Sequence, residues 1–262
     1  MTDRFRIGMI VPSSNVTMET EIPALLDARP DHFDEAFTFH SSRMRMQSVT
    51  EEELARMDEQ SEDCAALLAD ARCDVLGYAC LIGIMAQGPG YHETSERRLH
   101  EITKENDGAA PVVTSAGALV RALDALEAER IALIAPYVEE LTQTVIEYLE
   151  GSGVEVIDYR TLECPDNLEV ARLDQRNLLP IAEELDLDKT DALVLSSCVQ
   201  MPSLSAIQAA EDHLGLPVLS AAVATTWDML NALRLSTTVP GAGRLLAQGT
   251  NHREEIELAV MD

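Results

Sequence analysis

The feature that most constrains the fold of this chain is an internal repeat. Three segments of the first half occur again, in the same order, in the second half: RIGMIVP as RIALIAP, DVLGYAC as DALVLSSC, and PVVTSAGALVRAL as PVLSAAVATTWDML. Chance similarity between buried strands does not account for three pairs in one order. The chain is therefore predicted to consist of two homologous halves, with repeat units of about residues 1–129 and 130–262.

Each half alternates short apolar runs with longer segments of helical period, a pattern typical of parallel strands covered by helices. Strands are predicted at Ile7–Val11, Val75–Ala79, Val112–Thr114, Ile131–Ala135, Val154–Ile157, Ala192–Leu195 and Val218–Ser220. Helices are predicted from Thr50 to Ala69, opened by a Thr50–Glu53 capping box, and at Ala116–Leu126 and Val223–Leu233. The predicted fold class is α/β, with two similar parallel-sheet halves related by a pseudo-twofold axis. Residues 1–115 with about 223–262 would form the first domain, and residues 116–222 the second.

The repeat places one cysteine at the same position in each half, at the carboxyl end of a predicted strand. Open α/β sheets bind ligands at these strand ends, so Cys80 and Cys198 are expected to face one cleft between the halves. Two opposed thiols suit nucleophilic attack or proton transfer on opposite faces of a small molecule, and a following helix amino terminus would lower a thiol pKa. Free cysteines are commonly just small buried residues, but the matched placement favours a functional pair. The other cysteines are interpreted as structural: Cys64, Cys73 and Cys164.

Charge and cysteine content argue against several classes of partner and site. The sequence has 46 acidic against 19 basic residues and a formal net charge of −27, so long-range repulsion disfavours nucleic acids and anionic membranes. It contains neither an apolar run of about 18 residues nor a signal-peptide pattern, so a cytoplasmic protein is expected. The five cysteines form no CxxC pair, and His40 and His92 stand alone, so no metal site is predicted.

Several motifs resemble those of the bacterial maleate isomerases, which share a superfamily with aspartate and glutamate racemases. The resemblance is carried by VPSSNVTMETEIP, FTFHSSRMRM, GYACL and SSCVQMPSL, together with TSAGALV, IAPY and PDNLEVAR, and runs from about Arg6 to Gly243. It implies an active site between two domains, a small dicarboxylate substrate (maleate or fumarate), no metal or organic cofactor, and a homodimer.

The same resemblance implies roles for individual residues. Cys80 would be the nucleophile and Cys198 the proton donor. The implied substrate-binding residues are Asn15, Tyr137 and Asn167, with backbone groups at Leu81, Ile82, Val199 and Gln200. Three of these have simpler interpretations, because Asn15 could cap the following helix, Tyr137 could pack at a strand end, and Asn167 could be a turn residue.

Two other functions remain open from the sequence. One is an amino-acid or hydantoin racemase, in which the thiols would act as base and acid on one carbon. The other is a non-catalytic dicarboxylate-binding protein that keeps the thiols as packing. An arylmalonate decarboxylase is disfavoured because such enzymes typically keep one of the cysteines. Arg43 and Arg45, in RMRMQ, are left unassigned.

Overall fold

The computed structural model describes residues 3–46 and 50–247, whose strands form two four-stranded parallel sheets. The first sheet has the order β2-β1-β3-β4, with strands β1 (Asp3–Pro12), β2 (Glu35–Met44), β3 (Val75–Tyr78) and β4 (Val112–Thr114). The second has the equivalent order β6-β5-β7-β8, with strands β5 (Arg130–Ala135), β6 (Glu155–Thr161), β7 (Ala192–Ser196) and β8 (Val218–Ser220). The α/β class with two similar parallel-sheet halves is thus confirmed.

Helices follow the strands in both halves. The first half contains α1 (Met18–Asp27), α2 (Glu51–Asp70), α3 (Leu81–Met85), α4 (Tyr91–Glu105) and α5 (Ser115–Ala125). The second contains α6 (Glu139–Gly151), α7 (Asn167–Val170), the 3-10 turn η1 (Gln175–Asn177), α8 (Leu178–Ala182), α9 (Leu204–Leu214), α10 (Ala221–Ala232) and α11 (Arg244–Ala247). The predicted cap of α2 is confirmed, since Thr50 Oγ1 accepts a hydrogen bond from Glu53 N at 3.3 Å. No helix among these described residues is long and apolar enough to span a membrane.

The sequence prediction was wrong at the edges of the sheets. It omitted β2 altogether and ended β6 at Ile157, whereas β6 continues to Thr161. Both are outer strands, and most of their residues are only partly buried. Central strands are covered on both faces, so their sequences are continuous apolar runs. A partly exposed edge strand tolerates polar residues and lacks such a run.

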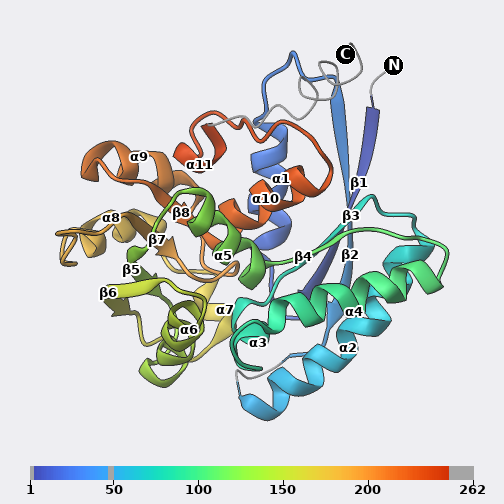
Figure 1. The fold of residues 1–262 in the computed structure, drawn as a ribbon, viewed down its shortest axis with the longest axis horizontal. Coiled ribbons are helices and arrows are strands. Elements are labelled where there is room, and N and C mark those ends of the chain that lie inside the picture. The colour runs from blue at the N-terminus through green and yellow to red at the C-terminus, as the bar shows by residue number, and fades with distance from the viewer. Residues whose placement is uncertain (1–2, 47–49, 248–262) are drawn as a thin grey trace.

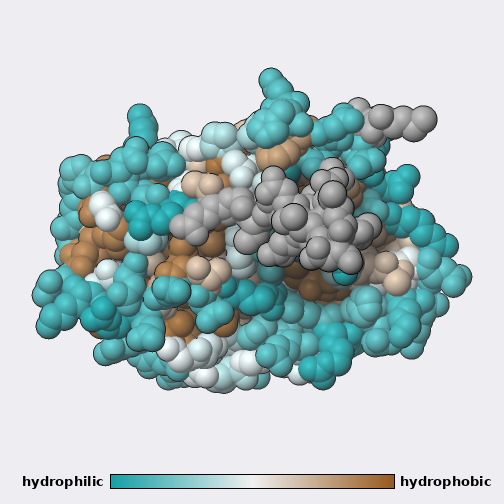
Figure 2. Space-filling view, turned by 45° about the horizontal axis from the view of Figure 1, so that its top comes forward, coloured by the Kyte–Doolittle hydropathy of each residue, from teal (hydrophilic) through white to brown (hydrophobic). Residues whose placement is uncertain are grey.

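The two sheets lie side by side, with α5 and α10 between them (Figure 1). Helix α10 packs against α5 and β8, and also against α1, β3 and β4 of the first half. We therefore propose that the chain forms two domains, one of residues 1–115 with 223–262 and the other of residues 116–222. Figure 2 shows a face of the molecule on which hydrophilic residues predominate among those that are coloured, with hydrophobic patches between them, in line with the acid-rich composition.

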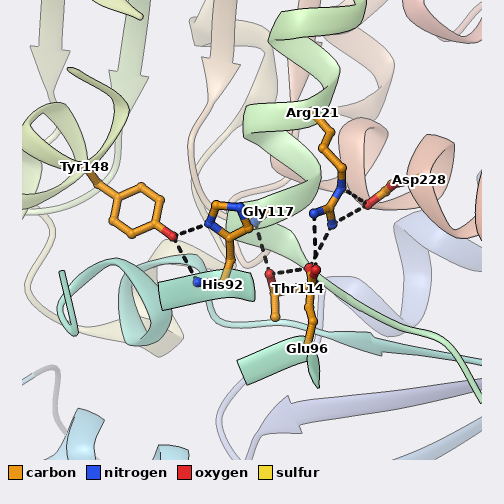
Figure 3. A network of polar contacts seen from close by, with 7 residues as sticks. All are labelled: His92, Glu96, Thr114, Gly117, Arg121, Tyr148 and Asp228. Carbon is orange, nitrogen blue, oxygen red and sulfur yellow. Dashed lines mark hydrogen bonds and ion pairs between the residues drawn. The ribbon is translucent and has the colours of Figure 1, made fainter. Parts of the chain in front are cut away.

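A polar network ties these central helices together (Figure 3). Arg121 of α5 donates to Glu96 of α4 at 2.7 Å and to Asp228 of α10 at 2.7 Å, and the two carboxylate side chains are only 16% and 11% exposed. Gly117 makes room for this contact, because a Cβ there would lie 2.6 Å from Glu96 Oε1. Burial raises the pKa of Asp228, and the Arg121 charge opposes that rise.

A separate pair of polar contacts, between His92 and Tyr148, links α4 to α6 of the second half (Figure 3). The Tyr148 hydroxyl lies 2.5 Å from Nδ1 of His92 and accepts a hydrogen bond from the His92 backbone N–H at 3.2 Å. His92 is buried, and this burial lowers its pKa, so the ring is neutral at physiological pH. His92, which the sequence analysis considered only as a metal ligand, therefore connects α4 to the second half.

Replacing Arg121 with methionine is expected to lower the free energy of unfolding by about 3 kcal/mol, because two largely buried carboxylates lose their counter-ion. Urea unfolding followed by circular dichroism measures the change. The matched control is Arg172→Met, since Arg172 pairs with Glu169 while their side chains are 71% and 54% exposed. The control substitution is expected to change the free energy of unfolding by less than about 0.5 kcal/mol. Equal stability of the two variants would contradict the structural importance of the network.

Candidate active site

Both repeated cysteines line one small cavity at the carboxyl ends of the sheets. Cys80 follows β3 and Cys198 follows β7. The cavity has a volume of about 20 Å³, enough for about one water molecule. Its lining includes all nine residues predicted for the site: Asn15, Cys80, Leu81, Ile82, Tyr137, Asn167, Cys198, Val199 and Gln200. Pro12, Met46 and Ala79 complete the lining.

The Cys80 thiol is held at the start of a short helix. Cys80 directly precedes α3, and the backbone amide of Gly83 in the first turn of that helix acts to lower the pKa of the Cys80 thiol. Glycine at position 83 lets this turn approach the thiol closely, since a Cβ would lie 3.0 Å from Cys80 Sγ and 2.7 Å from Met57 Cε. Burial nevertheless raises the pKa of Cys80 to about 12. The expectation that a helix amino terminus would lower this pKa overall was wrong, because desolvation outweighs one amide.

The Cys198 thiol has a different set of neighbours. Burial raises its pKa, and hydrogen bonds from the Tyr137 hydroxyl and from the backbone amides of Gln200 and Met201 act in the opposite direction. Gln200 N lies 3.4 Å from Cys198 Sγ, and Ser197 O, 3.5 Å from the Tyr137 hydroxyl, is the alternative acceptor for the single hydrogen of that hydroxyl. Tyr137 is therefore more than packing at a strand end, because its hydroxyl contacts the second thiol.

The Pro-Ser-Ser-Asn segment forms the wall that the first half contributes. Asn15 Oδ1 accepts a hydrogen bond from Met18 N, the first residue of α1, at 3.1 Å. Asn15 thus makes the helix contact considered from the sequence and lines the cavity as well. Ser13 Oγ donates to Met46 O at 3.2 Å and accepts from Met46 N at 3.0 Å, which fixes the end of β2 beside the same loop.

Arg43 supports this loop, a role that the sequence did not reveal. Its guanidinium donates to Asn15 O at 2.9 Å and to Ser13 O at 3.3 Å, and it pairs with Glu19 of α1. Carbonyl groups turned toward Arg43 leave the other side of the loop to face the cavity. The signal was present in the RMRM motif, but a lone arginine gave no indication of its partners.

The second half contributes Asn167, the first residue of α7. Its Nδ2 donates to Ser14 Oγ at 2.7 Å across the two halves. Asp166, the residue before it, caps α7 by accepting from Leu168 N at 2.8 Å. The turn that was considered from the sequence is thus made by Asp166, which leaves the Asn167 side chain at the cavity.

Among the described residues that line it, the cavity has hydrogen-bond donors but no basic side chain. The donors are the side chains of Asn15, Tyr137 and Asn167, together with backbone amides beyond each cysteine. Such neutral groups can bind carboxylates when several converge on one place. A larger cavity of about 580 Å³ lies outside and shares Met46 and Asn167 with the inner one.

Comparisons with known proteins identify relatives of this chain. The arylmalonate decarboxylase family model matches residues 7–246. A maleate isomerase of Geobacillus stearothermophilus is 61% identical over 248 residues, covering 94% of this chain and 99% of that protein.

Two solved structures are also closely similar. The maleate isomerase Iso from Pseudomonas putida S16, as a cysteine-to-alanine variant with maleate, has a TM-score of 0.92 at 56% identity and covers 94% of this chain and 98% of its own. A cysteine-to-serine mutant of the Nocardia farcinica maleate cis-trans isomerase, with a covalently bound succinylcysteine intermediate, has a TM-score of 0.90 at 48% identity. It covers 94% of this chain and 99% of its own.

Proposed function

Since this chain belongs to the arylmalonate decarboxylase family and, within it, to the maleate isomerases, we propose that it converts maleate to fumarate through Cys80 and Cys198. The observation that carries the proposal is the convergence of two thiols from equivalent strand ends on one cavity. The succinylcysteine in the Nocardia farcinica relative supports a covalent route.

The reaction must turn a carbon–carbon double bond temporarily into a single bond. The Cys80 thiolate attacks one alkene carbon, and a C–S bond forms while the π electrons move toward the other carbon and its carboxylate. The Cys198 thiol protonates that second carbon and becomes the thiolate. Rotation about the new single bond follows. Cys198 then takes a proton back, the C–S bond breaks, and fumarate leaves with the Cys80 thiolate restored.

This cycle requires that the two thiols share one proton. A second thiolate beside the first is opposed by repulsion, and the charge of Cys198 acts to raise the pKa of Cys80. Asn15, Asn167 and the backbone amides would hold the substrate carboxylates and stabilise the charge that develops on the one next to the protonated carbon. Tyr137 donates to Cys198 and would stabilise its thiolate after proton transfer.

Other properties implied by membership are part of the proposal. We propose a homodimer in the cytoplasm that needs no metal or organic cofactor. No group of three or more His, Cys, Asp or Glu side chains in residues 3–46 and 50–247 is arranged to hold a metal ion.

Proton NMR of maleate with the reduced protein, without added cofactor, tests the function. Fumarate is expected to appear, and kcat/KM is expected to rise about tenfold per pH unit up to the pKa of the thiol pair. The sign follows from burial: a raised pKa leaves less thiolate at any given pH, so the rise continues beyond the ordinary thiol range of about 8.5. If wild type binds maleate without forming fumarate, the chain is a dicarboxylate-binding protein; racemisation of aspartate instead would identify a racemase.

A further inference from the structure

The side chain of Gln200 joins the two halves beside the proposed proton donor. Gln200 lies two residues after Cys198 and is 1% exposed. Its Oε1 accepts hydrogen bonds from Val16 N at 2.9 Å and from Thr17 N at 3.3 Å, both in the loop that follows β1. The Thr17 hydroxyl returns a hydrogen bond to Gln200 O at 2.7 Å.

The amide nitrogen of the same side chain holds two further loop segments. Nε2 donates to Ser14 O at 2.9 Å and to Asn167 O at 2.9 Å. A carboxamide has two donor hydrogens and two acceptor lone pairs, so the bonding capacity of this group is fully used. Its own backbone N–H contacts Cys198 Sγ at 3.4 Å.

These partners are the immediate surroundings of the substrate-binding asparagines. Ser14 and Val16 flank Asn15 on both sides, and the fourth hydrogen bond goes to the Asn167 carbonyl itself. Arg43 braces the Asn15 loop from within the first half, whereas Gln200 relates that loop to the second half. One buried side chain thus sets the distance between Asn15, Asn167 and Cys198.

We propose that Gln200 is a positioning residue, whose carboxamide assembles the two substrate-binding loops against the Cys198 thiol. The inference rests on the function proposed above and concerns the side chain, not the backbone contact to substrate implied by the family resemblance. A fully satisfied buried carboxamide would also stabilise the fold, so the test must separate positioning from stability.

The first variant is Gln200→Met, which keeps the length of the side chain and removes its four hydrogen bonds. We expect kcat/KM for maleate to fall on the order of 10²-fold in protein that is still folded, because displacements of about 1 Å in an active site have effects of this size. The control is Gln143→Leu on α6, where Gln143 Nε2 donates to Glu139 at 2.7 Å and to Tyr159 at 2.8 Å, away from the cavity. The control is expected to keep the wild-type kcat/KM.

The second variant, Gln200→Glu, gives a readout that a purely structural role would not move. A carboxylate can accept from Val16 and Thr17 but cannot donate to Ser14 O or Asn167 O, whereas a protonated carboxyl regains one donor. Burial raises the pKa of a carboxyl, so protonation occurs in a pH range where the protein can be assayed. The ratio of variant to wild-type kcat/KM is therefore expected to rise as the pH falls.

The wild-type enzyme provides the reference for this ratio. It carries the same titratable and charged groups on the elements packed around position 200, so their own titration cancels in the ratio: Glu19, Glu21, Arg43, Cys80, Tyr137, Asp166 and Cys198. A carboxylate at position 200 also raises the pKa of the nearby thiols, so the ratio is compared with that of Gln200→Met at low pH, where the new carboxyl is neutral and should leave the Glu variant the more active of the two. For Gln200→Met the ratio should not depend on pH. If that variant cannot be folded, the Glu variant decides the question alone.

Two results would overturn the inference: a folded Gln200→Met variant with wild-type kcat/KM, or a Gln200→Glu ratio that is flat with pH. A wild-type protein that forms no fumarate would instead refute the function on which the inference rests, so the two failures are distinguishable.

Discussion

Replacing Cys80 with serine is expected to lower kcat/KM for maleate by at least about 10⁴-fold, as loss of a catalytic nucleophile does in other enzymes. The hydroxyl is similar in size to the thiol but far less acidic, so neither Gly83 nor the neighbouring groups can generate the alkoxide at neutral pH. The fold should be retained, because serine fits the space that the thiol occupies. Fumarate formation by NMR, together with the thermal unfolding midpoint, measures both effects.

The matched control for this substitution is Cys64→Ser. Cys64 is also buried, lies on α2 outside the cavity, and already has a hydrogen bond with Ser42 that a hydroxyl can keep. The control is expected to retain turnover. Residual activity of Cys80→Ser within tenfold of wild type would remove Cys80 from the proposed mechanism.

Replacing Cys198 with serine is expected to abolish turnover and to trap a covalent adduct on Cys80. A hydroxyl can deliver a proton slowly during addition, but water then returns a proton to the alkoxide, and the neutral hydroxyl is too weak a base to remove a proton from the succinyl group at neutral pH. Turnover should therefore fall by about 10³-fold or more, within the range known for loss of one member of a catalytic set. Intact-protein mass spectrometry after incubation with maleate should show one added molecule of maleic acid.

The position of the adduct distinguishes the two thiols. Peptide mapping should locate it at Cys80, and the double variant Cys80→Ala/Cys198→Ser should carry none. An adduct found on Cys198 in the Cys80→Ser variant would mean that the roles of the thiols are reversed. The succinylcysteine in a cysteine-to-serine mutant of the Nocardia farcinica relative makes this a realistic intermediate to trap.

The central strands of the fold could be predicted because burial on both faces requires apolar side chains, which give a recognisable sequence pattern. Strands β1, β3, β5 and β7 are covered on both faces and read as apolar runs, and the repeat identified their equivalence. Strand β2 was not predicted because most of its residues are only partly buried and its sequence mixes apolar with polar residues. An edge strand is defined by its neighbour, here β1, and not by its own composition.

The lining of the site could also be predicted, but its supporting contacts could not. Symmetry located the cysteines, and the resemblance supplied the proposed substrate-binding residues, which the structure brings to one cavity. Gln200 and Val16 are 184 positions apart in the chain, so no local pattern indicates their hydrogen bond. The direction in which the two cysteine pKa values shift could not be predicted from the sequence either, since it depends on how completely the folded protein excludes water from the thiols.

The equivalent strand order of the two sheets has a consequence for how such a site could arise. A single half that paired with its own copy would present two thiols in identical surroundings. Both thiols would then have the same pKa and the same reactivity toward the substrate. Once the copies are fused in one chain, each can accumulate its own substitutions. Cys80 now meets the Gly83 amide, whereas Cys198 meets Tyr137 and two amides. Gene fusion thus provides the asymmetry by which a substrate that is itself symmetric is attacked at one end and protonated at the other.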